Sequence, residues 1–255
     1  VQRNPESVDT SFTLLDRFVE EIKLIPETEV SHHKLLVYFD GRVVIPEMIS
    51  SWYEVWKEEA QKGKELPLTL RPTDLVKRMD QYEIDLPWAT PFRLTGKAIS
   101  YIFNATLIRP DPYSQSAPFC SQLIDRLADV LPRGARLSVF MINSTLDLLN
   151  KSELDDRVEE AERLFARASD DNIRLDLYSY NTLLSVYAKA GQDKKAQRLL
   201  DAFVSDHLNG RGPGSHVVPA PDIISFHAIA SAYANSGNGL SAAREIDRMI
   251  KRIQN

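Results

Sequence analysis

The sequence contains an internal repeat, and this repeat limits the chain to a small set of folds. Residues 180–191 recur as residues 226–237, at a shift of 46 positions. In both copies apolar or small residues stand at i, i+3, i+4, i+7 and i+8, which is one face of an α-helix. Each copy ends at a glycine, the usual residue at a helix stop, and a second helical pattern follows. The repeated unit is therefore predicted to be two helices joined by a short turn.

The same template extends toward the N-terminus, where the second-helix pattern around Ala196 recurs around Ala161, 35 positions earlier. One helix pair cannot cover its own apolar face, so neighbouring pairs are expected to stack into an all-α solenoid with a continuous core. Residues 138–255 follow the template closely, residues 40–137 diverge from it, and residues 1–39 are expected to form an N-terminal helical cap segment. We predict five helix pairs, at 40–87, 88–137, 138–175, 176–221 and 222–255.

Three short stretches do not follow the helical pattern. The apolar run 34–39 fits either a strand or a helix. Because a lone strand would have no partner, we expect a helix or an irregular buried segment there. Residues 108–118 and 209–221 are rich in Pro or Gly and are predicted to be irregular loops.

The best-matched repeats resemble the pentatricopeptide repeat (PPR) family. The resemblance rests on three short motifs, which are Tyr180-Asn181 at the start of a first helix, Lys189-Ala190-Gly191 at its end, and Pro221-Asp222 before the next repeat. It covers about residues 138–255 and implies a right-handed superhelix whose first helices line the concave face. The lengthened repeats with a Gly/Pro insertion are similar to those of PPR proteins from algal lineages.

The resemblance also implies which residues read RNA bases. In PPR proteins, a polar residue early in the first helix and the residue that ends the repeat together bind one base. The corresponding pairs here are Asn143 with Asp176 and Asn181 with Asp222, a combination that favours uracil in the family. Asn and Asp are also common helix-cap residues, so a role in folding alone is the alternative for each pair.

Further residues of the first helices are implied to contact RNA. Phe140 and Tyr178 stand three residues before each Asn, where the family places side chains that sandwich bases. An aromatic side chain in that place stabilises binding by about 1–3 kcal/mol per base. His227 takes the position of the Asn in the last repeat.

The charge balance leaves two kinds of binding partner open. The 255 residues carry 31 Lys and Arg against 36 Asp and Glu, and residues 138–255 hold 14 against 16. This balance gives no basic surface of the kind that supplies most of the affinity for nucleic acids. We therefore expect single-stranded RNA binding, or alternatively a protein scaffold that is a subunit of a large assembly such as an organellar ribosome. In either case the family implies a mitochondrion or a plastid.

No catalytic, metal-binding or cofactor site is predicted. The sequence has no P-loop, GxGxxG or HExxH motif. Cys120, the single cysteine, falls on an apolar helix face and is expected in the core, and Trp52 and Trp56 are expected to pack together on one helix. No apolar run approaches the roughly 18–20 residues that span a membrane. We expect a binding protein rather than an enzyme, with no small-molecule substrate and no membrane span.

Overall fold

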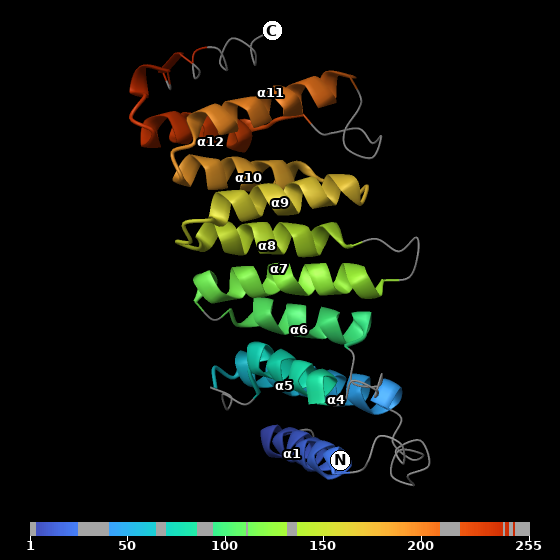
Figure 1. Cartoon of the computed structure of the whole chain (residues 1–255). Coiled ribbons are helices and arrows are strands. Elements are labelled where there is room, and N and C mark those ends of the chain that lie inside the picture. Colours follow the sequence, from blue (N-terminus) through green and yellow to red (C-terminus); the bar gives the residue numbers. More distant parts are fainter. Residues whose placement is uncertain are drawn as a thin grey trace. The chain divides into compact units, whose positions relative to one another are not determined.

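The computed structural model describes residues 4–24, 41–64, 70–85, 94–110, 112–131, 137–209, 220–241, 243, 244 and 247. Every regular element within these ranges is a helix, and helices pack on one another in sequence (Figure 1). The predicted all-α fold of helix pairs is thus confirmed. The chain divides into two compact units, Val1–Pro110 and Asp111–Asn255.

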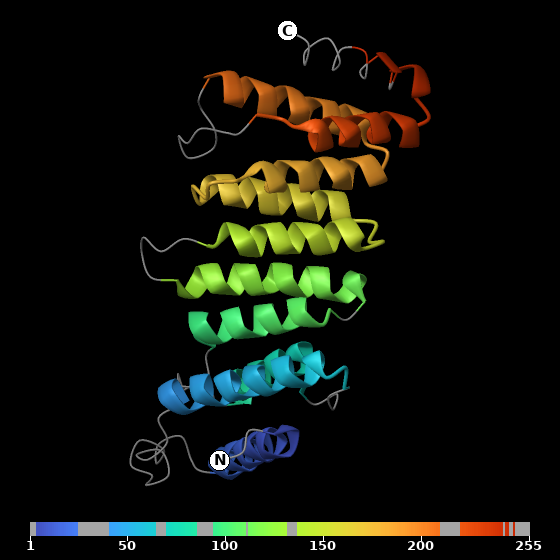
Figure 2. The same ribbon diagram turned by 180° about the vertical axis from the view of Figure 1, so that it is seen from behind.

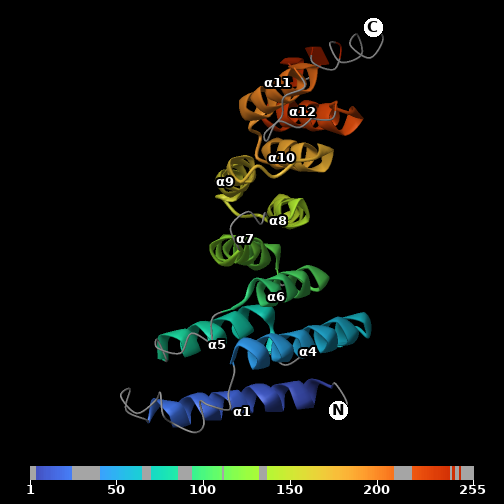
Figure 3. The ribbon, with the colours of Figure 1, turned by 90° about the vertical axis from the view of Figure 1, so that its right-hand side faces the viewer.

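The second unit is a two-layered stack. Its helices are α7 (Tyr113–Val130), α8 (Val139–Lys151), α9 (Arg157–Asp170), α10 (Leu177–Lys189), α11 (Asp193–Asn209) and α12 (Ile223–Asn235). The first helices α8, α10 and α12 contact one another in succession and form one layer, while α7, α9 and α11 lie in the other (Figure 3). Both α9 and α11 pack against the two first helices that flank them in sequence, an order that is also visible from behind (Figure 2).

The core of the second unit follows the repeat pattern. Helix α10 buries Tyr180, Leu183 and Leu184, and α11 buries Leu200 and Phe203. The rings of Tyr180 and Phe203 are stacked, with 4.2 Å between their centroids. Burial at i, i+3 and i+4 is what an amphipathic helix requires when it covers a neighbour with one face. The apolar periodicity of each helix therefore identifies the face that lies in the core.

Gly191 ends helix α10 in a conformation that suits glycine. Its φ is +63°, and an added Cβ would lie 3.4 Å from the backbone oxygen of Asn235 in α12. The last residue of the second copy of the repeat, Gly237, has a φ of +79°. The two glycines predicted as helix stops thus occupy left-handed positions, which residues with a side chain rarely adopt.

The first unit contains α1 (Pro5–Lys23), α4 (Gly41–Gln61), α5 (Pro72–Asp85) and α6 (Gly96–Ile108). Helix α4 contacts both α1 and α6. Trp52 and Trp56 are buried on α4 with their ring centroids 5.8 Å apart, as predicted. Their indole N–H groups donate to the carbonyl oxygens of Leu70 at 2.8 Å and Ala105 at 2.9 Å. These two hydrogen bonds satisfy the polar atoms that burial of the indoles would otherwise leave unpaired.

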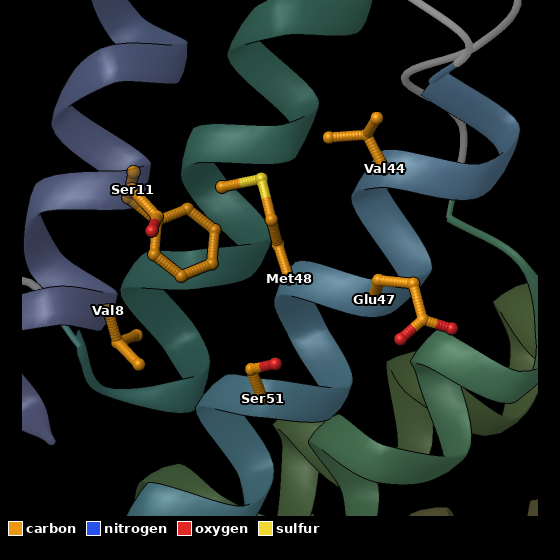
Figure 4. Close-up of a pocket in the computed structure, with 7 residues that line it drawn as sticks. Val8, Ser11, Val44, Glu47, Met48 and Ser51 are labelled. Carbon is orange, nitrogen blue, oxygen red and sulfur yellow. The ribbon is translucent and has the colours of Figure 1, made fainter. Parts of the chain in front are cut away.

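A mainly apolar pocket of about 340 Å³ lies between α1 and α4 in the first unit (Figure 4). Val8 and Ser11 on α1 face Met48 and Ser51 on α4. Among the described residues that line the pocket, Glu47 is the one titratable side chain, and the Ser11 hydroxyl donates to the backbone oxygen of Ser7.

One predicted loop is shorter in the structure. Helix α7 begins at Tyr113 and contains Pro118, so the expectation of an irregular loop over 108–118 is wrong for residues 113–118. A proline inside a helix removes one backbone hydrogen bond. Burial of Ala117 and Cys120 on the same helix face offsets that loss. The prediction for residues 34–39, and that for 210–219, lies outside the described residues.

Candidate nucleic-acid interface

Two first helices of the second unit, α10 and α12, begin after acidic cap residues. Asp176 precedes α10 with extended backbone angles, and its carboxylate accepts a hydrogen bond from the backbone N–H of Ser179 at 2.9 Å. In return, the Ser179 hydroxyl oxygen accepts from the backbone N–H of Asp176 at 3.1 Å. This reciprocal pattern is a capping box, and it satisfies backbone donors that have no partner within the helix. Asp176 therefore acts as the N-cap residue of α10.

The cap of α12 repeats this geometry. The Asp222 carboxylate accepts from the backbone N–H groups of Ile224 and Ser225, each at 3.0 Å. The Ser225 hydroxyl oxygen accepts from the backbone N–H of Asp222 at 3.2 Å. Both junctions thus have the sequence Asp-X-X-Ser at the start of a first helix. The repeat conserves its phase across an interval of 46 residues.

Each acidic cap binds an asparagine of the preceding first helix. The Asn143 side-chain amide nitrogen donates to the two carboxylate oxygens of Asp176, at 3.1 and 3.2 Å. The Asn181 amide nitrogen donates to Asp222 at 3.0 Å. The structure therefore brings together the residues of both predicted Asn–Asp pairs. Neither Asn caps its own helix, because the N-cap residues of α8 and α10 are Ser138 and Asp176.

A serine completes each pair, and the sequence analysis did not identify it. The Ser179 hydroxyl lies 2.6 Å from Oδ1 of Asn143, and the Ser225 hydroxyl lies 2.5 Å from Oδ1 of Asn181. We call Asn143, Asp176 and Ser179 the Asn143 cluster, and Asn181, Asp222 and Ser225 the Asn181 cluster. The Asp-X-X-Ser sequence at both junctions is the pattern from which these serines could have been predicted as parts of a cap. The hydrogen bond to Asn depends on how closely two repeats stack.

The two clusters differ in their access to solvent. Asn143 is only 9 % exposed, whereas Asn181 is half-buried. Burial alone would raise the pKa of Asp222, but hydrogen bonds from the Ser225 backbone, the Asn181 amide and the Ser225 hydroxyl outweigh it and lower this pKa. Asp222 is therefore a carboxylate near neutral pH and acts only as an acceptor.

Exposed apolar side chains lie beside the clusters. Phe140, Tyr178 and Ile224 are each the second residue of a first helix, and they are 56 %, 53 % and 58 % exposed. Equivalent positions of three successive first helices thus each leave more than half of an apolar or aromatic side chain open to solvent. Ile224 was not predicted, although the shift of 46 from Tyr178 leads directly to it. His227, the predicted third reader, lies exposed on α12.

Two lysines in the last turns of α8 and α10 are engaged within the protein. Lys151 forms an ion pair with Asp147 at 2.6 Å and lies 5.9 Å from the centre of the Tyr113 ring. Lys189 donates to the backbone oxygen of Asn150 at 2.6 Å, and this bond links α10 to α8. The corresponding bond between α12 and α10 runs from the Asn235 amide to the oxygen of Ala188 at 2.8 Å. Neighbouring first helices are therefore linked near their N-terminal ends by the Asn–Asp hydrogen bonds and near their C-terminal ends by these two bonds.

Other kinds of site are not found among the described residues. They contain no group of three or more His, Cys, Asp or Glu side chains arranged to hold a metal ion. Cys120 is fully buried, and burial raises the pKa of its thiol to about 12, as suits the predicted core role. Within the same ranges, no helix is long and apolar enough to cross a membrane.

Helix pairs joined through repeated caps, with exposed side chains at equivalent positions of the first helices, define a helix-pair repeat fold. Residues 163–209 match the pentatricopeptide repeat domain. This match covers most of α9, all of α10 and α11, and the cap Asp176 with Ser179 and Asn181. The chain therefore contains a PPR, a repeat that typically binds RNA, that is generally non-catalytic and that is common in organellar proteins. A comparison with curated proteins finds no match.

Proposed function

We propose that the second unit binds single-stranded RNA along the N-terminal turns of α8, α10 and α12, and that it does so in a mitochondrion or a plastid. The observation that carries this proposal is the repetition of one arrangement. Asn143 and Asn181 are each held by the acidic cap of the next repeat, and an exposed aromatic side chain stands three residues before each. Successive bases of an extended strand require such a repeated arrangement of an edge-binding group and a stacking group.

The hydrogen-bonding capacity of the clusters supports base contacts. An asparagine amide has two N–H donors and two acceptor sites on its oxygen. In the Asn181 cluster, Asp222 takes one donor and Ser225 takes one acceptor site. One N–H and one lone pair are then left for a ligand. Uracil offers a carbonyl acceptor next to an N–H donor, so it can satisfy both.

Stacking is expected to supply more of the affinity than charge. Phe140 and Tyr178 each expose about half of their surface, and a stacked base contributes about 1–3 kcal/mol. Residues 138–255 hold 14 basic against 16 acidic residues, and Lys151 and Lys189 are engaged within the protein. We therefore expect weak binding whose dependence on salt is shallow, because few phosphates are neutralised.

A protein scaffold is the second candidate function. It is favoured by the low exposure of Asn143 and by the complete set of bonds within its cluster, since these are the properties of a lock between repeats. In this alternative, the row of Phe140, Tyr178 and Ile224 contacts a subunit of a large organellar assembly, such as a ribosome. Both candidate functions use the same exposed side chains and differ in the partner. Measurements of RNA binding therefore distinguish them.

Fluorescence anisotropy with labelled 12-residue homopolymers at low salt tests RNA binding. We expect binding of oligouridine, and we expect Tyr178→Ala to weaken binding to every homopolymer by about fivefold or more, because stacking does not depend on base identity. Leu14→Ala is the matched control, since Leu14 is 57 % exposed and belongs to the first unit. Undetectable binding by the wild type at low salt, where electrostatic attraction is strongest, would favour the scaffold.

A further inference from the structure

The two serines of the clusters have a geometry that a helix cap alone does not require. The Ser179 hydroxyl oxygen accepts from the backbone N–H of Asp176, which leaves its single proton to be donated elsewhere. Two acceptors lie in reach, Oδ1 of Asn143 at 2.6 Å and Oδ1 of Asp176 at 3.0 Å. In the second cluster, the same distances from Ser225 are 2.5 Å to Asn181 and 3.1 Å to Asp222. The shorter contact in both places is the one to asparagine.

This contact fixes which way the asparagine amide points. The oxygen and nitrogen ends of an amide have nearly the same shape, so only hydrogen-bond partners determine their positions. The carboxylate of Asp222 accepts only, and it therefore holds the nitrogen of Asn181. The Ser225 hydroxyl donates to the oxygen, so the two partners favour the same orientation. A rotated amide would place its oxygen against the carboxylate, and the Ser225 hydroxyl would lose its nearer acceptor at 2.5 Å and keep only the longer contact to Asp222 at 3.1 Å.

The orientation of this amide decides between pyrimidines of equal size. Uracil presents a carbonyl oxygen beside an N–H, whereas cytosine presents an amino group beside a bare ring nitrogen. The donor and acceptor are therefore exchanged between the two bases. An amide whose nitrogen and oxygen ends are fixed can match only one of these patterns in a given pose, and a freely rotating amide can match both.

We propose that Ser179 and Ser225 are positioning residues which hold the amides of Asn143 and Asn181 in one orientation and thereby select uracil over cytosine. This inference rests on the proposed RNA-binding function. Ser179 and Ser225 are both completely buried. They do not touch the base, and they act through the asparagine.

The first test follows the Asn181 side chain in the free protein, without RNA. In an NMR spectrum of ¹⁵N-labelled protein, the Asn181 amide group is identified by its loss in Asn181→Ala. We expect its two proton resonances to be resolved and slow to exchange in the wild type. In Ser225→Ala the exchange should become about threefold to tenfold faster, which is the effect of losing one ordinary hydrogen bond. Unchanged exchange would overturn the proposal at its structural step.

The second test compares oligouridine with oligocytidine by fluorescence anisotropy. The wild type should prefer oligouridine, and Ser225→Ala should lower the ratio of the two affinities by about threefold to tenfold. The loss should come from stronger relative binding of oligocytidine rather than from a general loss of affinity. Ser225→Thr retains the hydroxyl and should retain the preference. If the Thr variant is unfolded by its added methyl group, Ser179→Ala provides the independent repetition in the other cluster.

Two control variants separate positioning from general loosening of the helices. Asn235→Ala removes the hydrogen bond to Ala188 at the opposite end of α10 and α12, and it leaves the Asn181 cluster intact. Ser7→Ala disrupts the capping box that Ser7 forms with Asn4 at the start of α1 in the first unit. Neither variant should change the ratio of affinities.

The outcomes distinguish this inference from the proposed function. If the wild type binds RNA with a preference that Ser225→Ala and Ser179→Ala leave unchanged, the positioning role is wrong and RNA binding stands. If the wild type binds no RNA, the proposed function fails. The selection of uracil then fails with it, even where the NMR experiment shows that the serine holds the amide.

Discussion

Replacement of Asp222 by alanine tests how strongly the caps hold the repeats together. The carboxylate accepts from the backbone N–H groups of Ile224 and Ser225 and from the amide of Asn181. Loss of an N-terminal cap costs about 1 kcal/mol, and loss of the hydrogen bond from the half-buried Asn181 amide costs about another 1 kcal/mol. We therefore expect Asp222→Ala to lower the free energy of unfolding of the second unit by about 2 kcal/mol.

Thermal and urea unfolding, followed by circular dichroism, measure this loss. For a unit of this size, about 2 kcal/mol corresponds to a decrease of about 4–8 °C in Tm. Asp222→Asn retains a good cap and an acceptor oxygen, so its loss should stay below about 1 kcal/mol. Asp156 is the matched control, because it precedes α9 without any side-chain cap hydrogen bond. If Asp156→Ala and Asp222→Ala destabilise the protein equally, the cluster contributes nothing and the reasoning is refuted.

Three further predictions concern Cys120, Trp56 and Asp222. Cys120 should not react with a thiol reagent at pH 8 until the protein unfolds, because it is fully buried and its pKa is raised to about 12; labelling of the native protein at the rate of a free thiol would contradict this. Trp56→Phe should destabilise the first unit by about 1–3 kcal/mol in urea unfolding, since it removes the hydrogen bond to Ala105, while RNA affinity stays unchanged. The pKa of Asp222 is lower in the folded protein than its ordinary value of 3.8. Its contribution to the free energy of unfolding should therefore be complete above that value and be lost as the pH falls through the lower folded pKa. An acid titration of the unfolding free energy in which Asp222→Asn loses as much as the wild type would disprove this.

The repeated apolar pattern was sufficient to predict the helix pairs because burial alone imposes it. In α10 the residues at the predicted face, such as Leu183 and Leu184, are the ones that lie in the core. The start of α7 was not predictable in the same way. A proline at position 118 reads as a helix breaker, and only the packing of Ala117 and Cys120 on neighbouring helices shows that a single lost hydrogen bond is tolerable.

The candidate site was predictable to the extent that it follows the phase of the repeat. The Asn–Asp pairs occupy equivalent positions, because each Asn stands five residues after the cap residue of its own helix and each Asp caps the next first helix. The serine contacts were not predictable, because a hydroxyl at the third helical position has an adequate role within its own capping box. Its short distance to an asparagine 36 or 44 positions earlier results from the stacking of two first helices, which local sequence does not specify.

The way in which each junction is divided between repeats has a consequence for how such arrays change length. The repeat at 176–221 carries both halves of the contact, since Asp176 receives the amide of its predecessor and Asn181 supplies one to its successor. A tandem duplication of this segment would therefore place a fitting carboxylate against a fitting amide at the new boundary. The adjoining repeats lack one half, because the preceding one begins at Ser138 and the following one has His227 in place of the amide. Of these three repeats, the one at 176–221 can therefore be duplicated in tandem with its Asn–Asp contact preserved at the new boundary.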